Sequence, residues 1–367
     1  MDQRSGMETG APVPIRPPSR RQRLWEALDE RLGLSALSYP VPEHANTLPY
    51  MLGGITLFGF VILILTGIYL TQYYNSDPGQ AHDSIVYLVQ QAPLGDFIRG
   101  VHYWMASLVM VTVLLHLLRI FITGAYKRPR EANWLIGVSL LVITVGFIFT
   151  GTVLKWDQEA YEAMLHNMAF SQLLGGMGTW FSQSFTLSVP MLARLYAVHI
   201  AVLPALLLIL IAVHLMLVKY HGISPRPTAE ARAGTWGKEG AGRFSAHLRR
   251  MGGYGLWLLV LAGLFALIWP APLGYAPVPG QEVTKPPWMF LWLYAFEDWV
   301  GIAGLFWAPT AFFALLALVP FLDRSSYLAP RRRPVALALG AALLLFLIGL
   351  SLYVALTPPV SHIQMGG

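Results

Sequence analysis

The chain has 367 residues, of which 55% are hydrophobic and only 12% are charged, whereas soluble domains carry about 25% charged residues. This composition excludes an ordinary soluble enzyme and predicts a polytopic membrane protein. The absence of cysteine excludes disulfides, thiolate metal sites and haem attached covalently through this chain. The formal charge of +6 does not indicate a nucleic-acid partner, because the basic residues follow the expected membrane topology.

The N-terminal segment, residues 1–47, is basic and rich in proline, and it contains no apolar stretch of the kind found in a signal peptide. We interpret it as a basic extension. Its residues from Leu24 to Leu32 predict a short amphipathic helix on the membrane surface.

Seven charge-free windows have the length that a helix needs to cross the hydrocarbon core, about 20 residues. They lie at 44–76, 100–118, 132–154, 195–218, 251–281, 299–322 and 334–367. An eighth window, 163–193, lacks a sustained apolar run and predicts a loop with short interfacial helices. The fold class is therefore all-α, with a four-helix domain at 48–220, an inner-side linker at 221–250 and a three-helix domain at 251–367.

The distribution of Lys and Arg predicts the orientation. With the N-terminus placed inside, the inner segments contain 21 of the 25 basic residues, as the positive-inside rule requires. We therefore expect a multi-pass protein of a bacterial cytoplasmic membrane, with a cytoplasmic N-terminus and an outer C-terminus. Arg331 to Arg333 are expected to lie near anionic lipid.

Two predicted helices carry histidines in matching pairs. His102 and His116 are 14 residues apart in one helix, and His199 and His214 are 15 apart in another. At about 100° and 1.5 Å per residue, each pair lies broadly on one face and is separated by about 21–22 Å. This separation excludes one shared zinc site. It favours two bis-histidine haem sites, one near each membrane surface, over the alternative of a histidine proton relay.

Glycines with the same spacing occur in the two neighbouring helices. Gly53 and Gly67 are 14 residues apart, as are Gly137 and Gly151. Glycine allows a close approach where a side chain would collide, so these positions would leave room for two macrocycles. Small-residue helix packing is the other interpretation. Three arginines near the helix ends could pair with haem propionates: Arg99, Arg119 and Arg194.

These features together resemble the cytochrome b subunit of Rieske/cytochrome b (bc-type) quinol-oxidising complexes. The resemblance covers nearly all of 45–360 and is carried by "LGGITLFGFVILILTG", "RGVHYWMASLVMVTVLLHLLRIFITGAYKRPRE", "NWLIGVSLLVITVGFIFTGTVLKWDQ" and "ARLYAVHIAVLPALLLILIAVHLMLVKYHGIS". "LGGIT" and "YKRPRE" are closer to the split form of oxygenic photosynthesis, here with the four-helix and three-helix parts fused in one chain.

The resemblance implies two haem b groups. His102 and His199 would ligate the outer, low-potential haem iron, and His116 and His214 the inner, high-potential one. The three arginines match family positions near propionates, with Trp134 a weaker candidate. Quinol would be oxidised at an outer site, one electron passing to a mobile Rieske iron–sulfur protein and the other crossing to an inner quinone site. A c-type cytochrome or other redox subunit, lipid and a second copy of the chain would complete the complex.

Three departures from the family concern the outer side. Pro-Glu-Trp-Tyr is replaced by Pro286, Pro287, Trp288 and Met289, so the glutamate that accepts a proton from quinol is absent. The loop "KWDQ" differs from the usual Pro-Trp-Gly-Gln or Pro-Trp-Asp-Gln. No cysteine stands near Met51, so the additional covalent haem of the split form is impossible. The candidates for the outer quinone site are Trp156, Asp157, Trp288 and Glu297. Further carboxylates nearby are Glu159, Glu282 and Asp298, and a charge in a solvated loop is the favoured interpretation of each of the five carboxylates taken singly.

The sequence thus predicts a quinol–cytochrome c type oxidoreductase subunit that moves electrons between quinone and a Rieske-type or cytochrome partner. The alternative is a dihaem subunit that couples another redox module to a single quinone site, without quinol oxidation at the outer site. A transporter with a histidine relay is a third hypothesis, disfavoured by the paired spacing. His221 and Arg226 are candidates for the inner quinone site, although an interfacial position in a basic loop is the slightly favoured interpretation.

Overall fold

The computed structural model describes residues 19–234 and 242–362. The chain divides into two compact units, residues 1–39 and 40–367. In the first, α1 (Arg20–Leu32) includes the segment for which a helix was predicted, and Ser19 begins it with a capping box to Gln22. The rest of the predicted extension, 1–18, lies outside the described residues.

Among the described residues of the second unit, seven helices are long and apolar enough to span a membrane, which confirms the predicted number. Their bounds are α2 (Leu48–Thr71), α4 (Gly95–Ile122), α5 (Glu131–Leu154), the continuous segment Met191–His221, α9 (Phe244–Ile268), α11 (Ile302–Leu322) and α12 (Pro334–Leu356). The protein is therefore an all-α, multi-pass membrane protein.

The segment Met191–His221 is not a uniform α-helix. It consists of α7 (Met191–Ala197), a π-helical turn η5 (Val198–Val202) and α8 (Leu203–His221). Pro204 has no N–H to donate to the turn before it, and a π turn accommodates one additional residue. This turn explains why the histidines of this segment are 15 residues apart while those of α4 are 14 apart.

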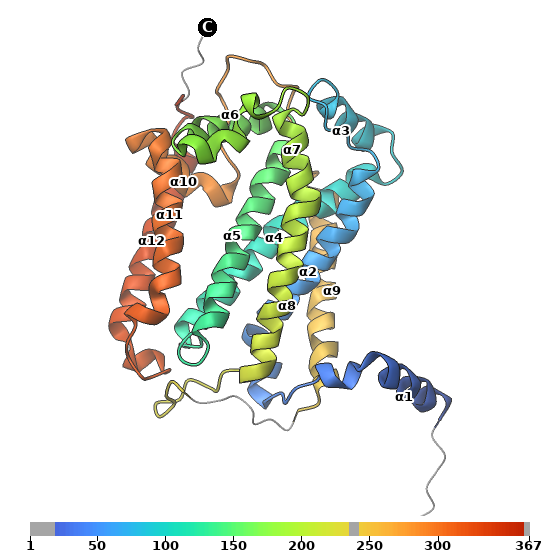
Figure 1. Ribbon diagram of the computed structural model, residues 1–367, viewed down its shortest axis with the longest axis vertical. Helices are drawn as coiled ribbons and strands as arrows, with labels where there is room; N and C mark the ends of the chain where they lie inside the picture. The colour runs from blue at the N-terminus through green and yellow to red at the C-terminus, as the bar shows by residue number, and fades with distance from the viewer. Residues whose placement is uncertain (1–18, 235–241, 363–367) are drawn as a thin grey trace, which may run out of the picture. The chain divides into compact units, whose positions relative to one another are not determined.

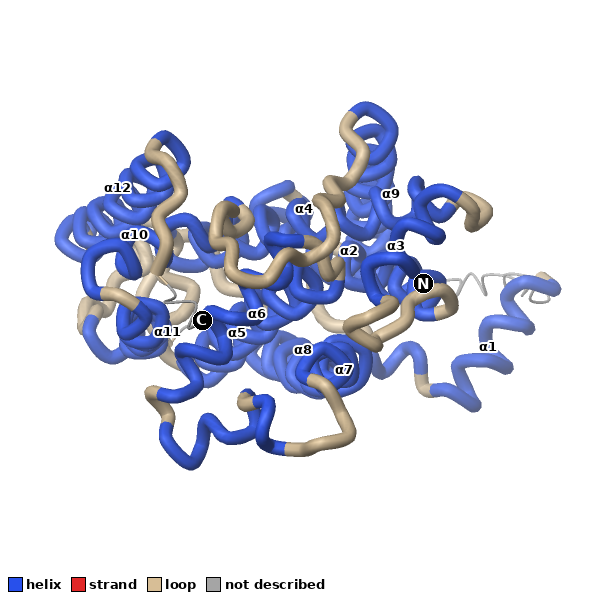
Figure 2. Tube along the Cα trace, turned by 90° about the horizontal axis from the view of Figure 1, so that it is seen from above, coloured by secondary structure: helices blue, strands red, loops and turns tan. Residues whose placement is uncertain are grey.

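The helices on either side of the central bundle come from the C-terminal half of the chain (Figures 1 and 2). Helix α9 packs against α2 and α4, whereas α11 packs against α5 and α6. The short helix α10 (Leu291–Val300) packs against both α11 and α12. The last three spans thus flank the four-helix bundle on two sides.

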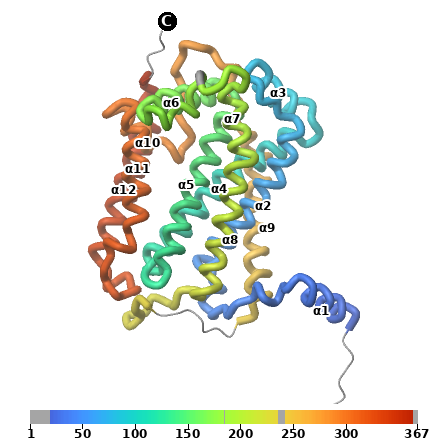
Figure 3. The backbone as a smooth tube through the Cα atoms, viewed as in Figure 1, coloured from blue at the N-terminus to red at the C-terminus, as the bar shows by residue number. Residues whose placement is uncertain are grey.

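Short helices cover one end of the bundle, which we call the outer end in accordance with the predicted orientation (Figure 3). They include α3 (Ala81–Gln90), α6 (Gln158–Gln172), η3 (Gly175–Phe181), η4 (Gln183–Phe185), η6 (Trp288–Phe290) and α10. The window 163–193 therefore forms short helices and loops, as predicted. The opposite, inner end carries η2 (Glu43–Asn46), η7 (Pro330–Arg332) and the loops 123–130, 222–234 and 323–333.

The centre of the bundle is an apolar core between the two ends. Side chains from α2, α4, α5, α8 and α9 pack together there, including Phe60, Met105, Val109, Ile143 and Leu207. A buried hydrogen bond of 2.9 Å from Thr56 Oγ1 to Thr112 Oγ1 joins α2 to α4. Many large apolar side chains on the outside of the helices are exposed, as expected for a surface in contact with lipid.

Candidate functional site

The outer histidines face each other across the bundle. His102 comes from α4 and His199 from the π turn η5. Their ring centroids are 6.5 Å apart, and the ring planes are inclined by 57°. Metal–imidazole bonds are about 2 Å long, so this separation accommodates one metal atom between the two rings.

The protonated nitrogen of each outer imidazole is fixed by a threonine. Nδ1 of His102 lies 2.9 Å from Thr66 Oγ1, and Nδ1 of His199 lies 2.8 Å from Thr150 Oγ1. Each hydroxyl donates its own proton to a carbonyl of its helix, Thr66 to Ile62 and Thr150 to Gly146. The hydroxyls therefore accept Nδ1–H, and both Nε2 atoms keep a free lone pair for a metal.

The inner histidines have a different environment. His116 comes from α4 and His214 from α8, and the two side chains are near enough to interact electrostatically. Their Nδ1 atoms are buried and form no well-aligned hydrogen bond among the described residues. The carbonyl of Asn133 lies near His214, but no hydroxyl occupies the place that threonine takes at the outer pair.

The predicted glycines face the histidines one by one. A Cβ added at Gly53 would lie 3.1 Å from Cε1 of His116, and one at Gly151 would lie 3.1 Å from Cε1 of His199. The corresponding distances are 3.5 Å from Gly67 to His102 and 3.8 Å from Gly137 to His214. Larger side chains at these positions would occupy the space beside each imidazole. The residues present therefore fit a bis-histidine macrocycle at each level.

The three predicted arginines have different partners. Arg99 donates to the carbonyls of Ala271 (2.9 Å) and Pro272 (2.6 Å). Arg194 donates to backbone carbonyls of the η3–η4 segment. Arg119 stacks over the ring of Tyr50 at 3.7 Å, and its buried Nε has no hydrogen-bond partner among the described residues. Arg119 thus has donor capacity left for an anionic group.

Trp156 and Asp157 form part of the support for the outer loops. Trp156 adopts a positive φ of 48° and donates from Nε1 to the carbonyl of Pro78 at 2.8 Å. Asp157 begins α6 by accepting from Ala160 N (3.1 Å), and its other oxygen accepts from Gly274 N (2.8 Å). It also pairs with Lys155 at 3.0 Å. Both carboxylate oxygens of Asp157 are therefore occupied.

Helix α6 also holds the segment that precedes η6. Gln158 Oε1 accepts from Val278 N at 2.7 Å, and the Glu162 carboxylate accepts from Val283 N (3.0 Å) and Thr284 N (2.9 Å). These bonds position Trp288, which is 45% exposed at the start of η6. Trp134, the weaker propionate candidate, instead donates to the carbonyl of Leu316 on α11 at 2.7 Å.

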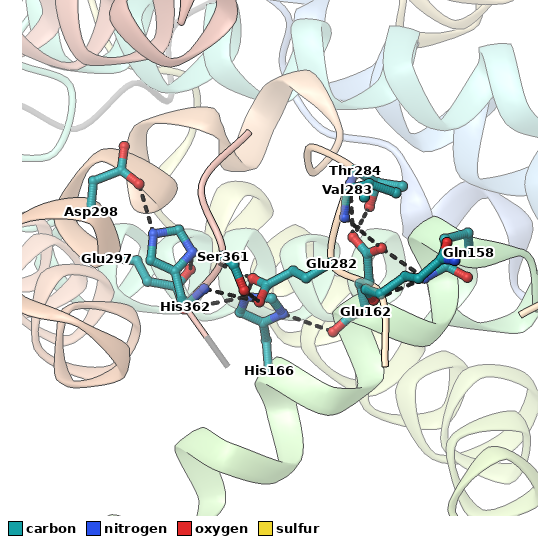
Figure 4. Close-up of polar contacts among 11 residues, drawn as sticks. Gln158, Glu162, His166, Glu282, Val283, Thr284, Glu297, Asp298, Ser361 and His362 are labelled. Carbon is teal, nitrogen blue, oxygen red and sulfur yellow. Dashed lines mark hydrogen bonds and ion pairs between the residues drawn. The ribbon is translucent and has the colours of Figure 1, made fainter. Parts of the chain in front are cut away.

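Glu297 belongs to a buried polar cluster that the sequence did not reveal (Figure 4). It lies on α10 with only 1% of its surface exposed, and it faces His166, Glu282 and His362. Burial raises the pKa of the Glu297 carboxyl to about 7, against the lowering effect of the two imidazoles. Glu282 was interpreted as a solvated loop charge, yet its side chain is 1% exposed.

A pocket opens at the inner end of α2. It is lined by His44, Thr47, Tyr50, Arg226, Pro227 and Thr228. Burial lowers the pKa of His44, and Arg226 and Arg119 lower it further, against the hydrogen bond to the Ser224 carbonyl. His221 turns back toward its own helix, with Nδ1 3.1 Å from the carbonyl of Leu217. Of the two candidates for an inner quinone site, Arg226 thus lines the pocket, whereas His221 is the last residue of α8 and is not among the lining residues.

Comparisons with known proteins agree with this geometry. The menaquinol:cytochrome c reductase cytochrome b subunit of Geobacillus thermodenitrificans is 38% identical over 218 residues, covering 55% of this chain and 97% of the relative. The chain belongs to the cytochrome b/b6 family. A family model described as "Cytochrome b(N-terminal)/b6/petB" matches residues 107–276 of this cytochrome b.

Further relatives extend the comparison. The cytochrome b6 of Heliobacterium modesticaldum is 34% identical over 198 residues, covering 53% of this chain and 93% of the relative. A solved chain of a hyperthermophilic respiratory complex III superposes with a TM-score of 0.76 at 24% identity, covering 91% of each chain. The curated relatives match about half of the chain, whereas the structural match includes the C-terminal helices. The shared fold is thus consistent with both parts being fused in one cytochrome b.

Proposed function

We propose that this cytochrome b carries electrons across the membrane between quinone and a Rieske-type or cytochrome partner, through two haem b groups. The observation that carries the proposal is the placement of four half-buried histidines as two neighbouring pairs, each imidazole opposite a helix glycine. His102 and His199 would hold the outer iron, and His116 and His214 the inner one. The haems supply one-electron chemistry when bound.

The side chains of this protein set the conditions for that transfer. Thr66 and Thr150 fix the tautomers of the outer ligands, and the four glycines leave room beside the imidazoles. The apolar core between the two levels excludes water. The free donor of Arg119 is suited to an inner haem propionate. Arg99 and Arg194 are proposed at the outer propionates, where their backbone contacts fix the guanidinium groups.

The inner pocket is our proposed site for quinone. His44 with its lowered pKa is neutral at pH 7. Because its Nε2–H donates to the Ser224 carbonyl at 3.0 Å, its Nδ1 is left to accept a hydrogen bond from a quinol hydroxyl. Tyr50 stands between this pocket and Arg119. We propose that the relatives' menaquinol chemistry extends to this chain, with a Rieske iron–sulfur protein and a c-type cytochrome as partners and a homodimer as the assembly. The N-terminus is proposed to be cytoplasmic.

A second candidate function omits quinol oxidation at the outer side. Pro287 and Met289 have no group that accepts a proton, and both oxygens of Asp157 are occupied by backbone and Lys155. The chain would then couple another redox module to quinone at the inner pocket alone. An inhibitor directed at the outer pocket distinguishes the two functions. If quinol reduces the haems equally well with and without the inhibitor, the second function is favoured.

Pyridine haemochrome spectra of the purified full chain test the haem assignment. We expect two haem b per chain, and about one in each of the variants His102→Leu and His116→Leu, with different remaining potentials. The control His82→Leu changes a histidine of α3 that bonds to the Gly274 carbonyl, and it should keep both haems. Haem content near zero in the unmodified chain, or unchanged in both ligand variants, contradicts the assignment.

A further inference from the structure

Four side chains from distant parts of the sequence converge at the outer end. His166 lies on α6, Glu282 in the segment before η6, Glu297 on α10 and His362 in the segment after α12. One ligand atom each of His166, Glu282 and His362 can lie within 4.8 Å of the others. Figure 4 shows the imidazoles and carboxylates directed toward a common centre.

The distances between the converging atoms are close to those between the ligands of one metal ion. His166 Nε2 lies 3.1 Å from Glu282 Oε1 and 3.3 Å from Glu297 Oε1. His362 Nδ1 lies 3.5 Å from Glu282 Oε1 and 3.8 Å from Glu297 Oε2. Donor atoms about 2.0–2.2 Å from one zinc ion, at tetrahedral angles, are about 3.3–3.6 Å apart. One atom each of His166, Glu282 and His362 can thus share an ion. Glu297 adjoins them, with Oε1 toward His166 and Oε2 toward His362.

The remaining polar atoms of three of these residues are held by other groups. His166 Nδ1 lies 2.8 Å from the Glu162 carbonyl, and His362 Nε2 lies 2.7 Å from Asp298 Oδ1. Glu282 Oε2 accepts from the hydroxyl of Ser361 and from the amide of His362, both at 2.9 Å. A carbonyl or carboxylate behind a ligating histidine is the usual arrangement at metal centres, because it fixes the tautomer and turns the other nitrogen toward the ion.

Four of the atoms that face the centre have no well-aligned hydrogen bond within the part of the chain that the structure describes. His166 Nε2, His362 Nδ1 and both carboxylate oxygens of Glu297 are buried without a hydrogen-bond partner among the described residues. The side chains of Glu297 and Glu282 are 0% and 1% exposed. Two carboxylates buried this deeply, with so few hydrogen bonds, are costly unless protons or a cation compensate their charge.

We propose that His166, Glu282, Glu297 and His362 bind one Zn²⁺ ion in a closed, four-ligand site. Nitrogen and oxygen ligands in tetrahedral arrangement favour zinc over Mg²⁺ or Ca²⁺, which take six or more oxygens. With all four positions filled by protein, the ion is structural. It joins the segment after α12 and the segment before η6 to α6 and α10, and so supports Trp288 at the outer surface.

Elemental analysis of the full chain, purified with its haem and washed with a weak chelator, tests the site. We expect about one zinc ion per chain in the unmodified protein. The zinc content should be at least tenfold lower in Glu297→Gln and in His362→Ala. The control His82→Ala changes another histidine at the same end and should retain the zinc. Haem spectra identify folded protein in every variant, so a failure to fold is not mistaken for loss of the ion.

Zinc K-edge absorption provides a second readout, with four nitrogen or oxygen neighbours at about 2.0 Å and imidazole scattering expected. Zinc below about a tenth per chain in the unmodified protein overturns the proposal. So does zinc that is equal in the unmodified chain, Glu297→Gln and His362→Ala, because that metal lies elsewhere. Another divalent ion on the same ligands overturns the assignment to zinc.

Discussion

The hydroxyl of Thr66 is expected to lower the potential of the outer haem. Thr66→Val removes the acceptor of the His102 Nδ1–H bond of 2.9 Å with almost no change in volume. A hydrogen bond from Nδ1–H makes the imidazole more basic, which stabilises the more positively charged oxidised iron. Its removal should therefore raise the reduction potential of that haem and leave the inner haem unchanged.

The magnitude follows from the strength of one hydrogen bond. A typical buried hydrogen bond contributes about 1 kcal/mol. The carbonyl of Leu63, which lies 3.2 Å from Thr66 Oγ1, offers the Nδ1–H of His102 a second acceptor and so limits the loss of free energy in Thr66→Val. For one electron a tenfold change in equilibrium is about 59 mV, so about 1 kcal/mol corresponds to about 40 mV. Thr150→Val should act in the same direction through His199.

Optical redox titration of the purified protein measures both potentials. The matched control is Thr56→Val on the same helix, which breaks the hydrogen bond to Thr112 but touches no histidine. An upward shift of one haem in Thr66→Val, absent in Thr56→Val, is the expected result. A downward shift, or equal shifts of both haems, would refute the reasoning.

Two predictions concern stability, measured as thermal unfolding in detergent. Gly100→Ala should destabilise the protein by about 1–3 kcal/mol, because the new Cβ would lie 2.8 Å from Cβ of Ala266 on α9. Gly54→Ala is the control and should destabilise it less, because its Cβ meets only the flexible end of the Met251 side chain. Equal losses of stability in the two variants would contradict this account of the packing. Asp323→Asn should cost about 3 kcal/mol, because the buried carboxylate pairs with Lys127 at 2.8 Å. Burial raises the pKa of Asp323, but hydrogen bonds, first that from Lys127, lower it below its ordinary value. The stabilisation by the Asp323 carboxylate is therefore complete above about pH 4 and is lost as the pH falls through the lowered pKa. A difference in stability between the unmodified protein and Asp323→Asn that stays constant below pH 4 would contradict this prediction.

Hydropathy and spacing predicted the seven spans and the pairing of histidines with glycines, because both depend on distances along a single helix. The cluster around Glu297 could not be predicted in this way. Its members come from four segments that are far apart in the sequence, and Glu282 and Glu297 carry no local pattern that separates them from solvated loop charges. The occupied state of Asp157 likewise depends on Gly274, which only the folded loop brings near it.

Because of the π turn at Val198–Val202, the position of His214 depends on the exact number of residues in its helix. Deleting one residue between this turn and His214 would rotate that imidazole by about 100° and draw it about 1.5 Å along the axis. Its ring would then point toward lipid or a neighbouring helix while His116 stayed in place. Two chains of equal hydrophobicity, one a single residue shorter, would thus cross the membrane equally well. Only the longer one would bring His214 to His116 and so complete the inner haem site.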